Sequence, residues 1–231
     1  MCLCTLVPKD KMIQFTDVSK NYDEDVVLKD ITFFIDKGDL AYITGPSGVG
    51  KTTLLKLIYC AERPDKGQLT VAGWDIKDLK QRTIPFLRRN VGIVFQDFRL
   101  LFNKTVFDNI AIALRIHNMH PKEIKEDVNE VLKDVKLQHK SNIYPNHLSG
   151  GEQQRVVIAR AMVSKPTVLL ADEPTGNLDA DNAKIIMNLF REINARGTTV
   201  LVATHNESLF HGTGRKVMYL RDNMIEKETV G

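Results

Sequence analysis

Residues 45–52 have the composition and spacing of a loop that holds phosphate groups. They read GPSGVGKT, which matches the pattern G-x-x-x-x-G-K-[ST]. In such a loop the glycines let successive backbone N–H groups point at phosphate oxygens, the lysine reaches the β and γ phosphates of a nucleotide, and the threonine hydroxyl ligates Mg²⁺. We therefore expect Thr52 to be a metal ligand and the nucleotide to contact Gly45, Pro46, Ser47, Gly48, Val49, Gly50, Lys51, Thr52 and Thr53.

A pair of acidic residues follows a second apolar run. Residues 168–171 are apolar, and Asp172 and Glu173 come directly after them. In a nucleotide hydrolase Asp172 would hold Mg²⁺ from the side opposite Thr52, and Glu173 would polarise the attacking water. The same pattern, taken alone, also describes a strand that enters a solvated turn. Because it occurs together with the phosphate loop, we favour the catalytic interpretation.

The segment LSGGEQ, residues 148–153, resembles the signature of ABC ATPases. It begins a helical pattern, so the start of that helix would present free N–H groups to a phosphate. A serine cap followed by a glycine turn is the ordinary alternative. The resemblance implies that this segment closes over ATP held by a second subunit, in a head-to-tail homodimer that forms in the ATP-bound state. It assigns nucleotide contacts to Ser149, Gly150, Gly151 and Glu152.

The other motifs of the ABC family occur in the expected order between residues 12 and 231. Tyr22 is similar to the aromatic residue that stacks on adenine, although a lone tyrosine before a turn is more often plain packing. The resemblance makes Gln96 a sensor of Mg²⁺ and of the attacking water, hence both a catalytic residue and a metal ligand. Asp179 belongs to a loop at the dimer interface that contacts nucleotide, and His205 contacts the γ phosphate.

The pattern of apolar residues predicts the elements that position these side chains. Alternating residues near the start indicate antiparallel strands, and the apolar runs at 41–44, 91–95, 168–171 and 200–203 indicate buried strands followed by helices. We therefore expect an α/β fold: a P-loop NTPase core with a mostly parallel sheet, an antiparallel β subdomain at the N-terminus and an inserted α-helical subdomain. The ATPase domain would span 12–231, with the insertion at about 97–163, Pro121 in the first turn of one of its helices, and a final hairpin near the end.

Composition limits the classes of function. The chain has 231 residues, 43% hydrophobic and 26% charged, which is typical of a folded globular domain. Its net charge of +3 is small for 32 basic and 29 acidic residues, so no overall basic field favours nucleic acid or anionic lipid. No run of apolar residues is long enough to cross a membrane. We therefore expect no nucleic-acid partner and no direct membrane insertion, and we expect membrane association to come through a partner protein.

The first residues and the cysteines say little about function. Residues 1–11 are expected to form a flexible extension, with Met12 as an alternative natural start. No basic residue precedes their short apolar run, and Pro8 and Lys9 follow it directly, so a signal peptide is not expected. Cys2, Cys4 and Cys60 do not have the spacing of a zinc site, and they favour a reducing compartment.

Two segments resemble those of the cell-division branch of the ABC family: FQDFRLL, residues 95–101, and ADEPTGNLD, residues 171–179. This resemblance implies a subunit at the cytoplasmic face of the bacterial inner membrane, bound to an integral membrane partner of the FtsX type that controls peptidoglycan hydrolases. Residues 97–104 would grip that partner, with Phe98, Leu100 and Leu101 either as exposed apolar anchors or as part of the core.

Of three alternatives, the first below stays open at this stage. The chain could be the ATPase of a lipoprotein-releasing or macrolide exporter, or an importer subunit, because those proteins share the same chemistry. A DNA-associated ABC ATPase would need a long coiled coil between phosphate loop and signature, and residues 53–147 leave no room for one. A scaffold that binds ATP without turnover is disfavoured because Glu173 and His205 are present.

Overall fold

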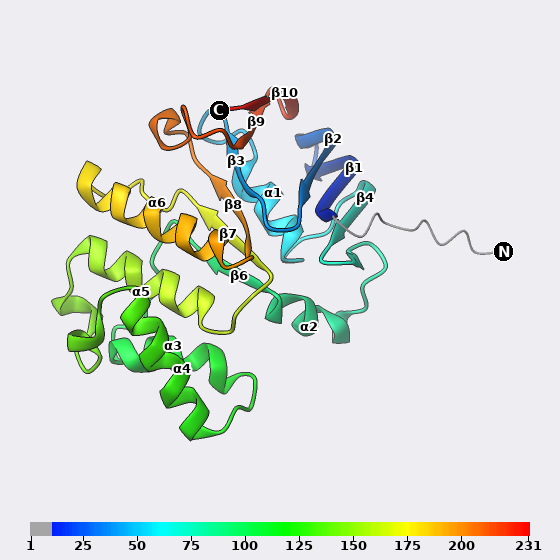
Figure 1. The fold of residues 1–231 in the computed structure, drawn as a ribbon. Coiled ribbons are helices and arrows are strands. Elements are labelled where there is room, and N and C mark those ends of the chain that lie inside the picture. Colours follow the sequence, from blue (N-terminus) through cyan, green and yellow to red (C-terminus); the bar gives the residue numbers. More distant parts are fainter. Residues whose placement is uncertain (1–10) are drawn as a thin grey trace.

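We describe the fold from a computed structural model, in which residues 11–231 are placed well enough to be described. The strands form one sheet of four and one sheet of six. Figure 1 shows the six-stranded sheet at the centre, the four-stranded sheet on the right and a group of helices at the lower left. The predicted flexible extension lies outside the described residues except for Lys11, which begins a strand. Cys2 and Cys4 also lie outside them.

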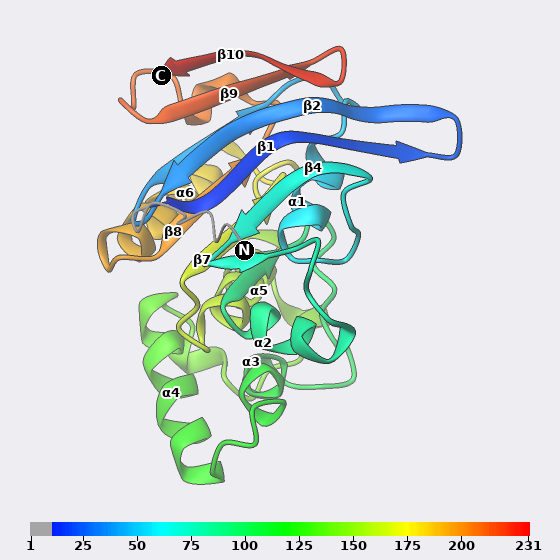
Figure 2. The ribbon, with the colours of Figure 1, turned by 90° about the vertical axis from the view of Figure 1, so that its right-hand side faces the viewer.

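The four-stranded sheet is antiparallel, with the order β2-β1-β4-β5. Alternate residues of its longer strands, such as Ile13 and Phe15, are buried, so one face of this sheet is apolar. In Figure 2 the β1–β2 hairpin extends far to one side of the molecule. The strands are β1 (Lys11–Tyr22), β2 (Asp25–Asp36), β4 (Lys66–Val71) and β5 (Trp74–Asp75).

The six-stranded sheet is parallel except for its last strand, in the order β10-β9-β3-β8-β7-β6. Every residue of β3, β7 and β8 is buried, as expected for parallel strands covered on both faces. The strands are β3 (Leu40–Thr44), β6 (Val91–Val94), β7 (Val168–Asp172), β8 (Thr199–Ala203), β9 (Lys216–Arg221) and β10 (Met224–Val230).

Successive residues of the central strands belong to two different cores because side chains alternate across a sheet. In β3, Tyr42 packs in a core that includes α6 (Ala180–Ala195) and the group of helices. Ala41 and Ile43 pack in the other core, with α1 (Lys51–Ile58) and the antiparallel sheet. The six-stranded sheet is therefore a layer with α6 and the group of helices on one face and α1 and the antiparallel sheet on the other.

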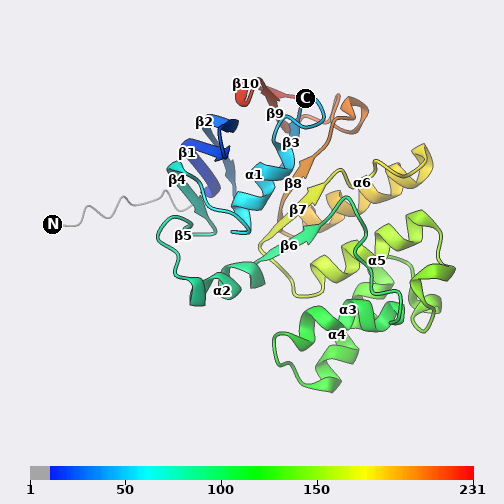
Figure 3. The ribbon, with the colours of Figure 1, turned by 180° about the vertical axis from the view of Figure 1, so that it is seen from behind.

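The group of helices consists of α3 (Val106–Arg115), α4 (Pro121–Asp134) and α5 (Gly150–Met162). Figure 3 shows it below the sheet, reached from the end of β6. As predicted, Pro121 is the first residue of a helix, and His120 and Glu123 form a capping box around it. The shorter helices are α2 (Ile84–Arg89), η1 (Gln81–Thr83), η2 (Gln138–Lys140), η3 (Pro145–His147) and η4 (Glu207–Leu209).

The predicted α/β class, with a mostly parallel sheet and an antiparallel sheet formed largely by the first strands, is confirmed. The helices α3, α4 and α5 lie where the insertion was expected, although the division of the chain into domains stays a prediction. Among residues 11–231, no helix combines the length and the apolar character that a membrane crossing requires.

One local prediction needs correction, and one open alternative is decided. Strand β6 ends at Val94 rather than Phe95. Leu100 is buried in the core beside the helices, so it is not an exposed anchor, and Phe98 packs partly against the same core. Leu101 is exposed as expected, and Phe102 beside it is 57% exposed.

Candidate nucleotide-binding site

The phosphate loop joins the carboxyl end of β3 to the start of α1, as the sequence predicted. Gly45 has φ of 153°, and a Cβ there would lie 2.1 Å from the carbonyl oxygen of Leu220, so only glycine fits. The Lys51 side chain is 7% exposed, and its ammonium donates to the carbonyls of Gly45 at 2.7 Å and Pro46 at 3.0 Å. The loop therefore already holds its lysine over its own concave side, where a phosphate would compete for it.

Asp172, at the end of β7, lies directly against this loop. The Thr52 hydroxyl donates to Asp172 Oδ2 at 2.8 Å. The other carboxylate oxygen, Oδ1, is buried and has no hydrogen-bond partner within the described chain. Burial raises the pKa of this carboxyl above its usual value, while the Thr52 hydrogen bond opposes that shift. A buried acceptor without a partner, next to a hydroxyl, is the kind of oxygen set that Mg²⁺ takes as ligands.

Glu173 follows Asp172 and forms the centre of a small polar network. Its backbone is left-handed, with φ of 45°, a strained conformation for a residue other than glycine that occurs often at active sites. Its carboxylate is 12% exposed and lies 3.6 Å from Lys51 Nζ. The ring Nδ1 of His205, which is 64% exposed, lies 2.9 Å from the same carboxylate. The predicted base and the predicted γ-phosphate contact are thus in direct contact with each other.

These residues line one cleft of about 610 Å³. Gln96 also lines it, from the loop after β6. The sequence did not identify Gly176 or Asn177 as lining residues. The lining residues are Pro46, Ser47, Gly48, Gly50, Lys51, Thr52, Thr53, Gln96, Asp172, Glu173, Gly176, Asn177 and His205. The cleft therefore brings together the predicted catalytic residues, the predicted metal ligands and most of the predicted phosphate contacts.

Tyr22 does not line this cleft. It lies at the end of β1, 38% exposed, and its hydroxyl donates to the carboxylate of Glu62. The Lys20 ammonium lies 5.6 Å from the centre of its ring. An exposed ring at the tip of a hairpin remains free to stack on a base, so adenine stacking by Tyr22 stays a prediction.

The signature residues form a second, separate cluster. Ser149 caps α5 by accepting a hydrogen bond from the Glu152 N–H at 3.3 Å, and the Glu152 carboxylate accepts one from the Ser149 N–H at 2.9 Å. Lys140 pairs with the Glu152 carboxylate and holds its pKa below the usual value. The serine cap considered as an alternative is therefore present, and it leaves the following glycine, Gly150, exposed at the start of the helix.

The loop that contains Asp179 packs beside this cluster. Asp179 caps α6 by accepting from the Asn182 N–H at 2.8 Å. A Cβ on Gly151 would lie 2.3 Å from the side-chain oxygen of Asn182, so the two helix starts touch at the glycine. Within residues 11–231, neither the signature residues nor Asp179 line the phosphate cleft. The fold thus divides the predicted nucleotide contacts between two surfaces.

Two polar side chains that the sequence did not identify fix the segment after Gln96. Arg160, on the signature helix α5, donates to the carbonyls of Arg99 at 2.7 Å and Phe98 at 2.9 Å. Asn109, fully buried on α3, bonds to the backbone of Leu101, Lys104 and Thr105. A lone arginine and a lone asparagine within helices carry no pattern that would have revealed this, since their partners are backbone groups.

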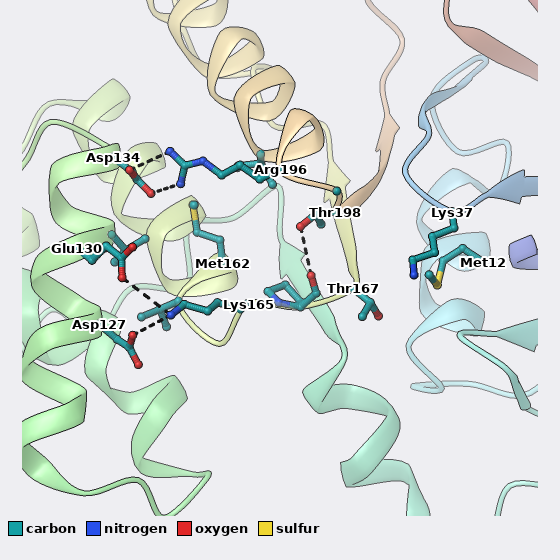
Figure 4. A pocket seen from close by; sticks show the side chains of 15 residues that line it. Met12, Lys37, Asp127, Glu130, Asp134, Met162, Lys165, Thr167, Arg196 and Thr198 are labelled. Atoms are coloured by element: carbon teal, nitrogen blue, oxygen red, sulfur yellow. Dashed lines mark hydrogen bonds and ion pairs between the residues drawn. The ribbon is translucent and has the colours of Figure 1, made fainter. Parts of the chain in front are cut away.

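A second cavity, of about 420 Å³, lies between α4 and the end of α6 (Figure 4). Its acidic side chains on α4 are paired with basic ones from the other side: Asp134 with Arg196 at 2.5 and 3.0 Å, and Asp127 with Lys165 at 3.1 Å. No residue that the sequence assigned to nucleotide, metal or catalysis lines it. These ion pairs join α4 to the end of α6 and to the segment between α5 and β7.

Comparison with known proteins gives one consistent result. Residues 28–176 match the family model described as ABC transporter. The cell division ATP-binding protein FtsE of Escherichia coli K12 is 49% identical over 215 residues, which cover 93% of this chain and 97% of that protein. FtsE of Streptococcus pneumoniae D39 is 46% identical over 218 residues, covering 94% and 95%.

Solved structures agree with these relatives. The ATP-binding cassette MJ0796, solved as a dimer in a post-hydrolysis state with ADP and Pi, has a TM-score of 0.86 at 35% identity and covers 95% of this chain and 98% of its own. The protein cbiO1 of Clostridium perfringens, part of the transporter complex cbiONQ, has a TM-score of 0.89 at 29% identity, with coverage of 96% and 89%.

Proposed function

This chain belongs to the ABC transporter family and is an ATP-binding, ATP-hydrolysing subunit, and we propose that it drives a membrane complex of the cell-division type. The observation that carries the proposal is the cleft in which Lys51, Glu173 and His205 meet at the phosphate loop. Relatives named as cell-division proteins, at 46–49% identity over nearly the whole chain, support the choice within the family.

In this proposal the triphosphate displaces the Lys51 ammonium from the carbonyls of its own loop. The ammonium and the backbone N–H groups of residues 47–53 then hold the β and γ phosphates, and Tyr22 stacks on the base. Glu173 accepts a hydrogen bond from water and directs it at the γ phosphorus, and His205 contacts the γ phosphate. ATP and water become ADP and phosphate.

We assign the metal ligands to Thr52, Gln96 and Asp172. The partnerless, buried Oδ1 of Asp172 beside the Thr52 hydroxyl supports a hard divalent cation, because such cations take oxygen ligands. When bound, Mg²⁺ would neutralise charge that develops on the phosphate oxygens. The protein's own part is to hold these oxygens at the loop before nucleotide arrives.

The second half of the site would come from another copy of this chain. Ser149, Gly150, Gly151 and Glu152 start a helix whose amino terminus suits a phosphate, yet they lie outside the cleft of their own subunit. Two copies arranged head to tail would place each signature over the other copy's nucleotide. The dimeric cassette among the similar structures supports this arrangement.

The membrane partner would be an integral protein of the FtsX type, which places this subunit at the cytoplasmic face of the inner membrane. The exposed Leu101 and Phe102, held by Asn109 on a rigid segment after Gln96, provide apolar contacts for such a partner. ATP-driven dimerisation would move the partner and thereby control peptidoglycan hydrolysis.

Two measurements test this proposal. Phosphate release by the purified chain with Mg-ATP should show steady turnover, and a protein that binds ATP without turnover would refute the ATPase assignment. Purification from detergent-solubilised membranes should recover an FtsX-type protein with the chain. Recovery of an exporter's membrane subunit instead would keep the chemistry and replace the cell-division role.

A further inference from the structure

The segment from Lys77 to Arg89 concentrates positive charge that the chain as a whole does not have. It contains five basic side chains and one acidic one, Asp78, so its net charge is +4. Because the whole chain carries +3, all other residues together carry about −1. We call this segment the α2 surface; its defining residues are Lys77, Lys80, Arg82, Phe86, Arg88 and Arg89.

The cations of the α2 surface are not neutralised within the protein. In the part of the chain that the structure describes, no carboxylate lies within 4.0 Å of any of the five, whereas ion pairs join basic and acidic groups at many other places. Arg88 donates to the carbonyls of Tyr59 and Cys60, which are neutral acceptors and leave its charge uncompensated. All five side chains are exposed.

An aromatic ring stands among these charges. Within α2, Ile84 and Leu87 are buried and anchor the helix, while Phe86 faces outward and is 50% exposed. The Arg89 guanidinium lies 5.0 Å from the centre of the Phe86 ring. Exposed cations around an aromatic side chain are the combination that favours the boundary between headgroups and acyl chains of an anionic membrane.

The α2 surface is connected to the segment proposed to contact the membrane partner. Arg88 bonds to the carbonyl of Tyr59, and the Tyr59 ring packs at 6.3 Å against Phe95. The guanidinium of Arg99 lies 4.0 Å from the centre of the Phe95 ring. Figure 3 shows α2 at the start of β6 and the path from the end of β6 to the helices. A membrane protein bound at Leu101 and Phe102 would place this subunit, and α2 with it, beside a bilayer.

We propose that the α2 surface binds the anionic headgroups of phospholipids directly. That the α2 surface lies beside a bilayer rests on the proposed function, whereas its exposed cations and aromatic ring do not depend on that function. The basic side chains come from a loop, the turn η1 and α2. Among residues 11–231, four of the five make no side-chain hydrogen bond, which suits mobile phosphate groups spread over a membrane better than a single acidic peptide. The chain as a whole has no basic field that favours lipid, and the proposal rests instead on the local charge of +4 in the α2 surface.

Vesicle flotation of the purified chain, without nucleotide, tests the proposal. Wild type should float with vesicles of phosphatidylglycerol and phosphatidylcholine and stay behind with phosphatidylcholine alone. The variant K80E/R82E/R89E should lose binding by about tenfold or more, since each basic residue near an anionic surface contributes to affinity. Phe86→Ser should weaken binding to a smaller extent.

A matched variant, K122E/K125E/K133E, makes the same change in charge on exposed positions of α4. It should bind within about twofold of wild type if affinity resides in the α2 surface, whereas equal loss in both variants would mean that overall charge alone matters. No flotation of wild type, or unchanged flotation of K80E/R82E/R89E, would overturn the proposal. If K80E/R82E/R89E floats like wild type but no longer recovers the membrane partner from detergent-solubilised membranes, the α2 surface binds a protein and not lipid. Phosphate release, measured in parallel, reports on the proposed function independently.

Discussion

The phosphate cleft and the signature differ in how far each is complete within one chain. In the cleft, Glu173 contacts both Lys51 and His205, and the side chains of Lys51 and Glu173 are nearly buried. At the signature, Ser149 and Glu152 satisfy each other's backbone, and Gly150 faces solvent with no polar group of this chain opposite it among residues 11–231. One region is thus prepared for a ligand from solution, and the other for a ligand that a second molecule carries.

This difference predicts that mutations in the two regions separate nucleotide binding from turnover. Changes in the cleft should alter binding or chemistry in a single subunit. Changes at the signature should leave binding to the single subunit intact and prevent the step that needs two copies.

The largest effect is expected for Glu173→Gln. The amide keeps the size of the side chain but cannot accept the proton of the attacking water, so turnover should fall by about 10²–10⁴-fold. ATP affinity should stay within a few-fold of wild type, as measured by equilibrium titration with labelled nucleotide. A turnover number close to wild type would remove Glu173 from the mechanism.

Lys51→Ala should have the next largest effect, on binding itself. It removes charge-assisted hydrogen bonds to the β and γ phosphates, each of which contributes about 1.5–3 kcal/mol, so ATP affinity should drop by about 100-fold. Titration with labelled ATP measures this, and circular dichroism provides the control for folding. Unchanged affinity would show that phosphate does not bind at this loop.

Gly150→Val tests the other region. A Cβ at this position meets only the Leu178 side chain, at an ordinary 3.8 Å, so the variant should fold. Binding of ATP to the subunit should remain within about twofold, while turnover falls by about tenfold because the added side chain blocks approach of the partner's phosphate. Equal loss of binding and turnover would contradict the separation of the two regions.

A smaller effect is expected at Arg160, which connects the signature helix α5 to the segment after Gln96. In Arg160→Gln the carbonyls of Phe98 and Arg99 lose their donor, at a cost of about 1–3 kcal/mol in unfolding free energy. Turnover should fall severalfold at unchanged KM for ATP, because the hydrogen bonds from Arg160 hold the segment that follows Gln96. Arg160→Lys should recover part of the turnover, and a loss of stability with normal turnover would leave Arg160 a purely structural role.

The sequence predicted which residues meet in the cleft, because their grouping follows from local patterns, while their roles in catalysis and metal binding stay predictions. The phosphate loop, Asp172, Glu173 and His205 each follow a short apolar run, and parallel strands bring such ends to one edge of a sheet. The sequence could not decide an outcome that depends on packing: Leu100 lies in the core and Leu101 does not, although both are leucines in one apolar stretch. Helices α3 and α6 were not predicted individually, and the backbone contacts of Arg160 and Asn109 have no counterpart in a local pattern.

The central claim is that ATP is bound between two copies of this chain. The most direct test is the mass of Glu173→Gln in solution, by light scattering at high protein concentration. With Mg-ATP the account predicts the mass of a dimer, and without nucleotide, or with Gly150→Val added, that of a monomer. A monomer in saturating Mg-ATP, in a protein that titration finds loaded with nucleotide, would contradict the account.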